Sequence, residues 1–272
     1  MLPLPRPTRQ RPPERPRPWP RRARLLLLAA LALTGAAGAA VAQWQRGGGG
    51  ARGGRGVWVE ENTRYDGRFA FVRLRYPVYR RSGWEFDYPA MERNLMTITR
   101  ELTSLRPHLA GSNVHDMDDP ELLRHPVAYL SEPGYWEPTD AEVAGLRTYL
   151  RKGGFLIVDD FMRGEWTNFE TQMLRVLPGA RIVKLDVSHP IFDSFFRIPS
   201  LDMTYPGNPN LQAQFLGIHE DDDPTKRLMV VVNYNNDIGD YMEWSGEGWW
   251  PVDLTNDAYK LAVNYLVYGM TR

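Results

Sequence analysis

From Phe69 onward, short apolar runs alternate with segments in which apolar residues recur every three or four positions. The apolar runs predict buried strands, and they cover residues 69–76, 127–131, 155–158, 181–185 and 228–232. The periodic segments predict amphipathic helices, and they cover residues 89–105, 139–152, 167–177 and 256–268. This alternation predicts an α/β fold with a doubly wound, mostly parallel sheet sandwiched by helices.

The most clearly marked unit is a helix followed directly by a buried strand. Thr139 and Glu142 have the Thr-x-x-Glu spacing of a capping box. Gly153-Gly154 ends that helix, where one glycine can adopt a positive φ. Residues 155–158 are apolar on both faces, which is typical of a central parallel strand. A second capping box, Thr167–Glu170, predicts the start of the next helix.

Three regions have weaker patterns. Residues 112–117 predict a short strand. Residues 197–227 predict mostly loop, in which residues 211–215 are a candidate strand. Residues 233–240 are rich in Asn and Asp and predict a polar loop after the strand at 228–232.

The N-terminal part of the chain differs in composition from the rest. Residues 1–42 join a Pro- and Arg-rich start to an Ala/Leu run that ends in Ala40-Val41-Ala42, which predicts a secretory signal. An uncleaved anchor is the alternative, because residues 25–42 almost reach the length that spans a bilayer. Residues 43–56 have the composition of a flexible linker, which leaves residues 57–272 as the α/β domain. We therefore expect an exported, periplasmic or envelope-associated protein that contacts a membrane only through residues 25–42, if these are uncleaved.

The net charge of zero hides an asymmetry. Of the 33 basic and 33 acidic residues, residues 1–42 hold eight arginines and one acid, Glu14, so 25 basic and 32 acidic residues remain, a net charge of −7. A domain of that sign should avoid nucleic acid and anionic lipid, and it favours cationic, neutral or sugar partners. The absence of cysteine excludes disulfides, thiolate metal sites and cysteine nucleophiles.

The segment Gly153–Asp160, a double glycine before a buried strand that ends in Asp-Asp, resembles an uncharacterised bacterial family, domain-of-unknown-function family 4159. Arg73–Pro77, Ser188–Phe192 and the closing helix at 256–268 are also similar to that family. The resemblance runs from about Phe69 to the C-terminus, and the order of the motifs carries it.

The resemblance implies a fold similar to the class I glutamine amidotransferases and to sugar-utilisation proteins of the same superfamily, an amidotransferase-like or flavodoxin-like sandwich. In those enzymes the strand that matches residues 155–158 leads into a sharp turn with the cysteine nucleophile. The matching turn here holds Asp159, Asp160 and Phe161. Cysteine-dependent amidotransfer is therefore excluded, and the resemblance implies a fold and a site location without a known activity.

Asp159 and Asp160 are the first candidates for a functional site, because ligands of open α/β sheets bind beyond the carboxyl ends of the strands. Neighbours on a strand point to opposite faces, so at most one of the two lines a given crevice. The alternative is that they accept hydrogen bonds from backbone N–H groups of the next loop or of a helix start. Arg163 and Trp166 follow on the same loop and would add polar and stacking contacts.

Asn233 and Asn235 follow the strand at 228–232, so they too lie at a carboxyl end and would share the crevice with Asp160. Turn chemistry alone equally explains an Asn-rich loop. The predicted binding residues are therefore Asp159, Arg163, Trp166, Asn233 and Asn235.

No catalytic residue is identified by the sequence, and the candidates are Asp160, Glu165 and His189. Ser-His-Pro at His189 is also a helix-start signature, which favours a structural role. The other histidines lack the close spacing of a metal site, and the acidic clusters at 116–119 and 221–223 lack the EF-hand pattern. We therefore expect no metal and no cofactor.

Aromatic residues add one further signal. Tryptophans beside Asp, Asn and Arg in loops suit sugar faces or a protein partner, and packing over the sheet edge is the alternative. The tryptophans expected in loops are Trp84, Trp136, Trp166, Trp244, Trp249 and Trp250.

Two hypotheses follow. The first is a non-catalytic binding or assembly domain of the bacterial envelope, with an envelope protein or a carbohydrate bound near Asp160 and Asn233. The second is a hydrolase that acts on carbohydrate or a cell-wall component, with Asp160 or Glu165 as acid or base. Whether the protein is an enzyme stays open at this point.

Overall fold

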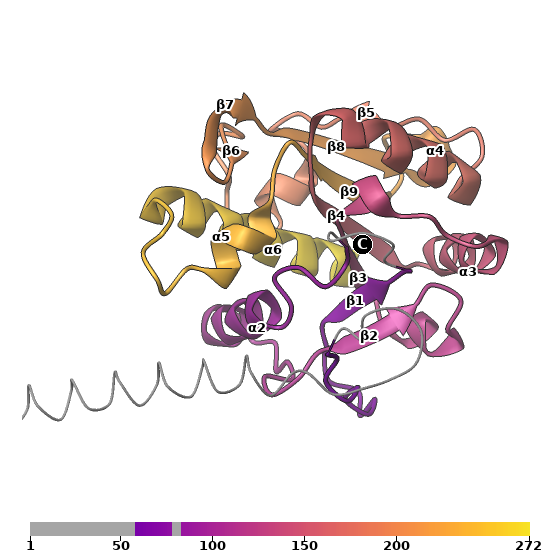
Figure 1. Ribbon diagram of the computed structural model, residues 1–272, viewed down its shortest axis with the longest axis horizontal. Helices are drawn as coiled ribbons and strands as arrows, with labels where there is room; N and C mark the ends of the chain where they lie inside the picture. The colour runs from indigo at the N-terminus through magenta and orange to yellow at the C-terminus, as the bar shows by residue number, and fades with distance from the viewer. Residues whose placement is uncertain (1–57, 78–82) are drawn as a thin grey trace, which may run out of the picture. The chain divides into compact units, whose positions relative to one another are not determined.

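Seven strands form one mixed sheet in the order β2-β1-β3-β4-β9-β8-β5 in the computed structural model, which describes residues 58–77 and 83–272 (Figure 1). The strands are β1 (Val72–Arg75), β2 (Asn113–Asp116), β3 (Val127–Ser131), β4 (Phe155–Phe161), β5 (Val183–Lys184), β8 (Gln214–His219) and β9 (Leu228–Tyr234). The five strands from β2 to β9 run parallel, whereas β8 is antiparallel to both of its neighbours. A mostly parallel α/β sheet is therefore confirmed.

Helices cover both faces of this sheet (Figure 1). On one face α2, α5 and α6 pack against one another, and on the other face α3 packs against α4. The helices are α2 (Ala90–Leu102), α3 (Asp140–Arg151), α4 (Trp166–Val176), α5 (Ile238–Glu243) and α6 (Val252–Thr271). A separate two-stranded ribbon pairs β6 (Thr204–Tyr205) with β7 (Asn208–Gln212).

The two central strands have no polar face. Every residue from Phe155 to Val158 and from Val230 to Val232 is buried, because helices cover both sides of β4 and β9. The strand that the sequence predicts at 155–158 therefore exists, but it continues through Asp159 and Asp160 to Phe161. Asp159 and Asp160 therefore belong to the last residues of β4 itself, and not to the loop that follows the strand.

Several other elements differ from the prediction. The capping box of Thr139 and Glu142 is confirmed, with both reciprocal hydrogen bonds present. The one predicted at Thr167–Glu170 is wrong, because α4 already begins at Trp166. The region predicted as mostly loop contains β7 and β8, and the polar loop after β9 contains α5.

Residues Val59–Arg272 form one packed unit. The predicted signal or anchor at 1–42 and the linker at 43–56 lie outside the described residues, so both stay predictions. Among the residues described, no helix combines the length and the apolar composition needed to cross a membrane.

A buried ion pair fixes the segment just before α2, residues 84–86. The guanidinium of Arg73 is completely buried and donates to Glu92 Oε1 at 2.5 Å. It also donates to the carbonyl oxygens of Trp84 (2.7 Å) and Phe86 (2.6 Å). Arg73 thereby holds in place the segment that leads directly to Asp87.

The variant Arg73→Met should lower the free energy of unfolding by about 3–5 kcal/mol, because it leaves the buried carboxylate of Glu92 without its cation. The double variant Arg73→Met, Glu92→Leu should regain most of that loss, since no unpaired buried charge remains. Urea titration measures both values. Arg75→Met is the matched control: its ion pair with Asp116 is about 40% exposed on each side (44% and 42%), so its loss should cost at most about 1 kcal/mol. A double variant as unstable as Arg73→Met would contradict this account.

Candidate functional site

The end of β4 is irregular at the two aspartates. The pairing of β4 with β9 shifts register between Val158 and Phe161. Asp160 lies at the shift with a φ of 60°, in the left-handed region that non-glycine residues seldom adopt. A bulge of this kind redirects a side chain, so Asp159 and Asp160 acquire different surroundings.

Asp159 is fully satisfied by the protein. Its Oδ1 accepts a hydrogen bond from Asn233 Nδ2 at 3.0 Å, and its Oδ2 accepts from Tyr129 Oη at 2.8 Å and from Gly239 N at 3.0 Å. Tyr265 Oη donates to Asn233 Oδ1 at 2.9 Å and extends the network to α6. Asp159 thus joins β4 to β3, β9 and the start of α5. The structural alternative, in which an aspartate bonds the N–H groups of a helix start, holds for Asp159.

Asp160 has weaker partners. Ser131 Oγ and Tyr205 Oη donate to its two carboxylate oxygens at 3.2 and 3.3 Å. Oxygens of Asp87 and Asp237 approach it, and one oxygen from each of the three carboxylates lies within 4.8 Å of the others. Asp160 therefore faces a group of acidic side chains from three separate segments.

Asp87 and Asp237 are delivered by the loops at the carboxyl ends of β1 and β9. Asp87 has a φ of 62°, and its Oδ2 is buried with no hydrogen-bond partner. Asp237 precedes α5 and accepts the N–H of Asp240 on Oδ1 at 2.7 Å. One turn along α5, Asp240 and Glu243 form a second group with Asp87, again with one oxygen from each within 4.8 Å. We call the full set the acidic cluster: Asp87, Asp160, Asp237, Asp240 and Glu243.

Gly239 makes room for this arrangement. A Cβ at this position would lie 2.6 Å from Asp87 Oδ2, 2.9 Å from Tyr129 Oη and 3.4 Å from Asp237 Oδ1. The first two distances are shorter than any contact that real Cβ atoms make, whereas the third is an ordinary contact. The missing side chain at Gly239 therefore lets Asp87 reach the start of α5.

The acidic cluster has little counter-charge, because the charge of Arg73 lowers the pKa of Asp87 by less than burial and the charge of Asp160 raise it. Burial, followed by the charge on Asp160, raises the pKa of Asp87 and of Asp237 well above the usual range. Burial and then the neighbouring Asp159 raise the pKa of Asp160. Among the described residues, no lysine or arginine forms an ion pair with a member of the cluster. Such a group must share protons or bind a cation, because buried carboxylates repel one another strongly.

Glu132 belongs to the same region. It follows β3 with a φ of 51°, and burial, then the charges of Asp160 and Glu165, raise its pKa to about 9. The carboxyl ends of β3, β4 and β9 therefore all contribute acids to one edge of the sheet, where ligands of open α/β sheets bind.

The other predicted binding residues build the neighbouring loop. Asn235 Oδ1 accepts the backbone N–H of Arg163 at 2.9 Å, while the Arg163 side chain is exposed. Trp166 packs against Phe161 and Tyr234, with ring centroids 6.4 and 5.0 Å away. The structure thus brings Asn233 together with Asp159, whereas Arg163, Trp166 and Asn235 pack or hold the adjacent loop.

Glu165 and His189, the other two catalytic candidates, lie in different parts of the structure. Glu165 Oε2 accepts the N–H of Met162 at 2.6 Å, which fixes the turn before α4. His189 Nε2 lies 3.2 Å from His219 Nε2, and His219 pairs with Leu228 where β9 begins. His189 is therefore at the opposite edge of the sheet from Asp160, and the two do not form one site.

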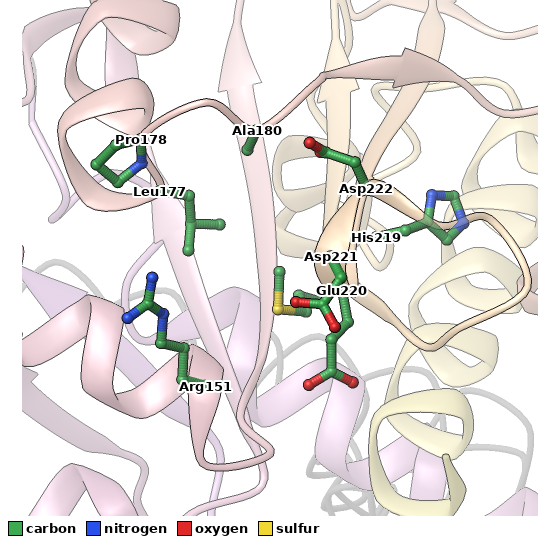
Figure 2. A pocket seen from close by; sticks show the side chains of 9 residues that line it. Arg151, Leu177, Pro178, Ala180, His219, Glu220, Asp221 and Asp222 are labelled. Carbon is green, nitrogen blue, oxygen red and sulfur yellow. The ribbon is translucent and has the colours of Figure 1, made fainter.

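A hollow also lies at that opposite edge. It has a volume of about 430 Å³, and Figure 2 shows Arg151 on one side of it and the turn with Glu220 and Asp221 on the other. His219 lines the same hollow. Nothing in its lining converges as the acidic cluster does, so we place the candidate site at the carboxyl ends of the strands.

The tryptophans divide between packing and exposure. Trp84 and Trp136 are buried, which supports packing for these two. Trp244 and Trp249 stack in parallel with ring centroids 4.4 Å apart, and Trp249 is 63% exposed. Trp244 directly follows Glu243, so this exposed aromatic pair adjoins the acidic cluster in the chain.

Neither Asp87 nor Glu243 is among the site residues predicted from the sequence. The signal for Asp87 is its place in the loop after the first strand, at the same sheet edge as Asp160. Asp237 and Asp240 were visible as part of the polar segment after β9. Glu243 had no signal, because its position depends on α5, which the sequence did not predict.

The variant Gly239→Ala should lower the free energy of unfolding by about 1–3 kcal/mol, because its methyl group would displace Asp87 or Tyr129. Helix propensity alone predicts the reverse, a gain of about 1 kcal/mol. Chemical unfolding distinguishes the two. Gly246→Ala is the control, since a Cβ at Gly246 meets nothing within 4 Å. A Gly239→Ala protein as stable as the unchanged one would contradict the close approach of Asp87.

The histidine pair predicts a pH dependence. Burial, followed by the charge of His219, lowers the pKa of His189 from 6.5 to about 4. The unfolded chain then binds more protons than the folded one between about pH 6.5 and 4, so stability falls as pH drops through that window. His189→Gln should reduce this slope in urea titrations at several pH values. His108→Gln, at the partly exposed His108, serves as the control, and equal slopes in all three proteins would refute the assignment.

Comparison with known proteins agrees with the resemblance of the Gly153–Asp160 segment. A family model described as a domain of unknown function (DUF4159) matches residues 68–270. The comparison with curated proteins found no match. The matched residues include all seven strands of the sheet and all five members of the acidic cluster. The chain belongs to the DUF4159 family, whose biochemical function is unknown.

Proposed function

We propose that this domain is a binding module for a hard divalent cation, held by Asp87, Asp160 and Asp237. The supporting observation is the buried Oδ2 of Asp87, which has no hydrogen-bond partner and belongs to a carboxylate grouped with two others. A buried ionised carboxylate costs several kcal/mol unless a proton or a cation compensates its charge. An ion among the three carboxylates would remove that cost.

The distances suit such an ion. Calcium and magnesium bind oxygen at about 2.0–2.6 Å, so two ligand oxygens on one ion lie at most about 5 Å apart. The three carboxylates meet this limit, with their ligand atoms within 4.8 Å of one another. All three ligands are oxygens, and the described residues place no histidine among them, which favours magnesium, calcium or manganese over zinc or copper.

Burial gives the site its selectivity for positive charge. Asp160 and Asp237 are only 4% and 6% exposed, so water screens their charges weakly. The net charge of −7 beyond the predicted leader has the same sign and favours the approach of cations. This proposal sets aside the earlier expectation of no metal, which was drawn from sequence spacing alone.

The hydrolase hypothesis needs a second acid or base beside Asp160, and neither Glu165 nor His189 supplies it. Glu165 caps a turn, and His189 lies at the other edge of the sheet. The carboxylates within reach of Asp160 are Asp87 and Asp237, which the cation-binding proposal already uses. Location in the envelope and an amidotransferase-like superfamily remain part of the proposal: the first rests on the leader sequence, and the second on the resemblance of the β4 turn.

Divalent cations should stabilise the full chain after treatment with EDTA. At a concentration 100 times the Kd, the gain is about 2.7 kcal/mol, or roughly 5–10 °C in Tm for a domain of this size. Differential scanning calorimetry with Mg²⁺, Ca²⁺ and Mn²⁺ in turn measures the shift. Asp160→Asn and Asp237→Asn should lose it while staying folded, because each removes a ligand and also a buried charge.

Asp221→Asn is the matched control for these variants. Asp221 has a φ of 54°, close to the 60° of Asp160, but it lies in a different acidic turn and pairs with Lys226. It should keep the full cation-dependent shift. The proposal fails if no divalent cation changes the Tm at millimolar concentration, or if Asp160→Asn responds as Asp221→Asn does.

A further inference from the structure

The acidic cluster consists of two groups that share one residue. Asp87, Asp160 and Asp237 form the first group, and Asp87, Asp240 and Glu243 form the second. In each group one oxygen per residue lies within 4.8 Å of the others. Asp87 is the shared member, and a carboxylate with two oxygens can ligate two ions at once.

The second group is held by the fold. Asp240 and Glu243 lie one turn apart on α5, so their side chains are on the same helix face. Asn94 of α2 donates to the carbonyl oxygens of Met242 at 2.9 Å and of Glu243 at 3.1 Å, which fixes the end of α5 against α2. The segment held by Arg73 supplies Asp87 from the other side.

Asp87 Oδ2 provides evidence beyond the clustering of acids. It is shielded from solvent and has no hydrogen-bond partner, although a carboxylate oxygen normally accepts at least one hydrogen bond. The position that a Gly239 Cβ would take lies 2.6 Å from this oxygen and 3.4 Å from Asp237 Oδ1. The unpartnered oxygen thus lies against Gly239, where the loop that carries Asp87 meets the start of α5.

The charge of the cluster favours two ions over one. Five ionised carboxylates carry a formal charge of −5, so one divalent ion leaves −3 and two ions leave −1. The guanidinium of Arg73, whose charge acts on Asp87 and Glu243, is already bonded to Glu92. Residual negative charge is costly next to the buried Asp160 and Asp237, and an ion on the second group, which shares Asp87, would lower that charge further.

Resting on the cation-binding function proposed above, we infer that the acidic cluster is a two-metal centre in which Asp87 bridges an inner ion on Asp160 and Asp237 and an outer ion on Asp240 and Glu243. Ions in two-metal sites lie about 3.5–4 Å apart and clamp one ligand between them. Asp160 and Asp237 are buried, whereas the shared Asp87 and the outer ligands Asp240 and Glu243 are partly exposed. The outer ion therefore keeps bound water and binds more weakly, and it is the one that an external oxygen-bearing ligand reaches.

Manganese is the probe for this centre, because Mn²⁺ occupies sites of oxygen ligands and is paramagnetic. The full chain, freed of metal with EDTA, should bind two Mn²⁺ per chain in equilibrium dialysis, one tightly and one weakly. Electron paramagnetic resonance should show spin coupling once the second ion binds. A cluster of acids that does not hold two ions close together would not give that coupling.

Glu243→Gln should remove the outer ion alone, leaving one tightly bound Mn²⁺ and an uncoupled spectrum. Asp87→Asn should weaken both sites by at least tenfold, because both share this ligand. Glu247→Gln is the matched control, since Glu247 is an exposed glutamate four residues along the same segment and outside the cluster.

The outcomes separate the two proposals. One bound Mn²⁺ in the unchanged protein overturns the two-metal centre and leaves the inner cation site standing. No bound Mn²⁺, together with no thermal shift by Mg²⁺ or Ca²⁺, overturns both. Two bound ions without spin coupling, or two ions retained in a folded Glu243→Gln protein, overturns the bridging arrangement. The measurements on the unchanged protein decide the question even if a variant does not fold.

Discussion

Carboxylates buried at the end of a central strand must be compensated, and most of this structure near β4 follows from that requirement. Asp159 is compensated from within, because Tyr129, Asn233 and the start of α5 all donate to it. Those hydrogen bonds connect β4 to β3, β9 and α5 at the carboxyl ends of the strands. The hydrogen bonds that Ser131 and Tyr205 donate to Asp160 are long, and its other close side-chain partner, Asp237, is itself an acid, so they compensate its charge only in part.

The same edge is assembled from segments far apart in the chain. Arg73 fixes the loop that carries Asp87, and the absence of a side chain at Gly239 lets that loop approach α5. Asp87, Asp160, Asn235 and Glu132 all have positive φ although none is glycine. Strained residues of this kind persist only where the surrounding structure holds them, and they concentrate at ligand sites. The backbone strain and the uncompensated acids therefore occur at one place in the fold.

The end of β4 offers oxygen ligands and no thiol. Asp159 and Asp160 occupy this position, and the chain has no cysteine. Oxygen ligands bind hard cations, and a bound cation can orient or polarise an oxygen-bearing partner without a protein nucleophile. The stacked Trp244 and Trp249 beside Glu243 offer a flat apolar surface next to that charge, as sugar-binding surfaces do.

Local signals, hydrophobic periodicity and helix capping, were enough to predict the alternation of strands and helices and the sheet edge at which Asp160 lies, and the order of short motifs was enough to predict the family. The sequence also excluded cysteine chemistry, which depends on composition alone. Only the folded chain shows which acids meet: Asp87 reaches Asp160 and Asp237 from a loop held by Arg73, and Glu243 reaches Asp87 from α5, a short helix that the sequence did not predict. The fold also gives Asp159 and Asp160 different surroundings. Because of the bulge in β4, Asp159 accepts hydrogen bonds from within the protein, whereas Asp160 faces the acidic cluster. Interactions between residues distant in sequence carry no local pattern, which is why the composition of the site, unlike its location, required the folded chain.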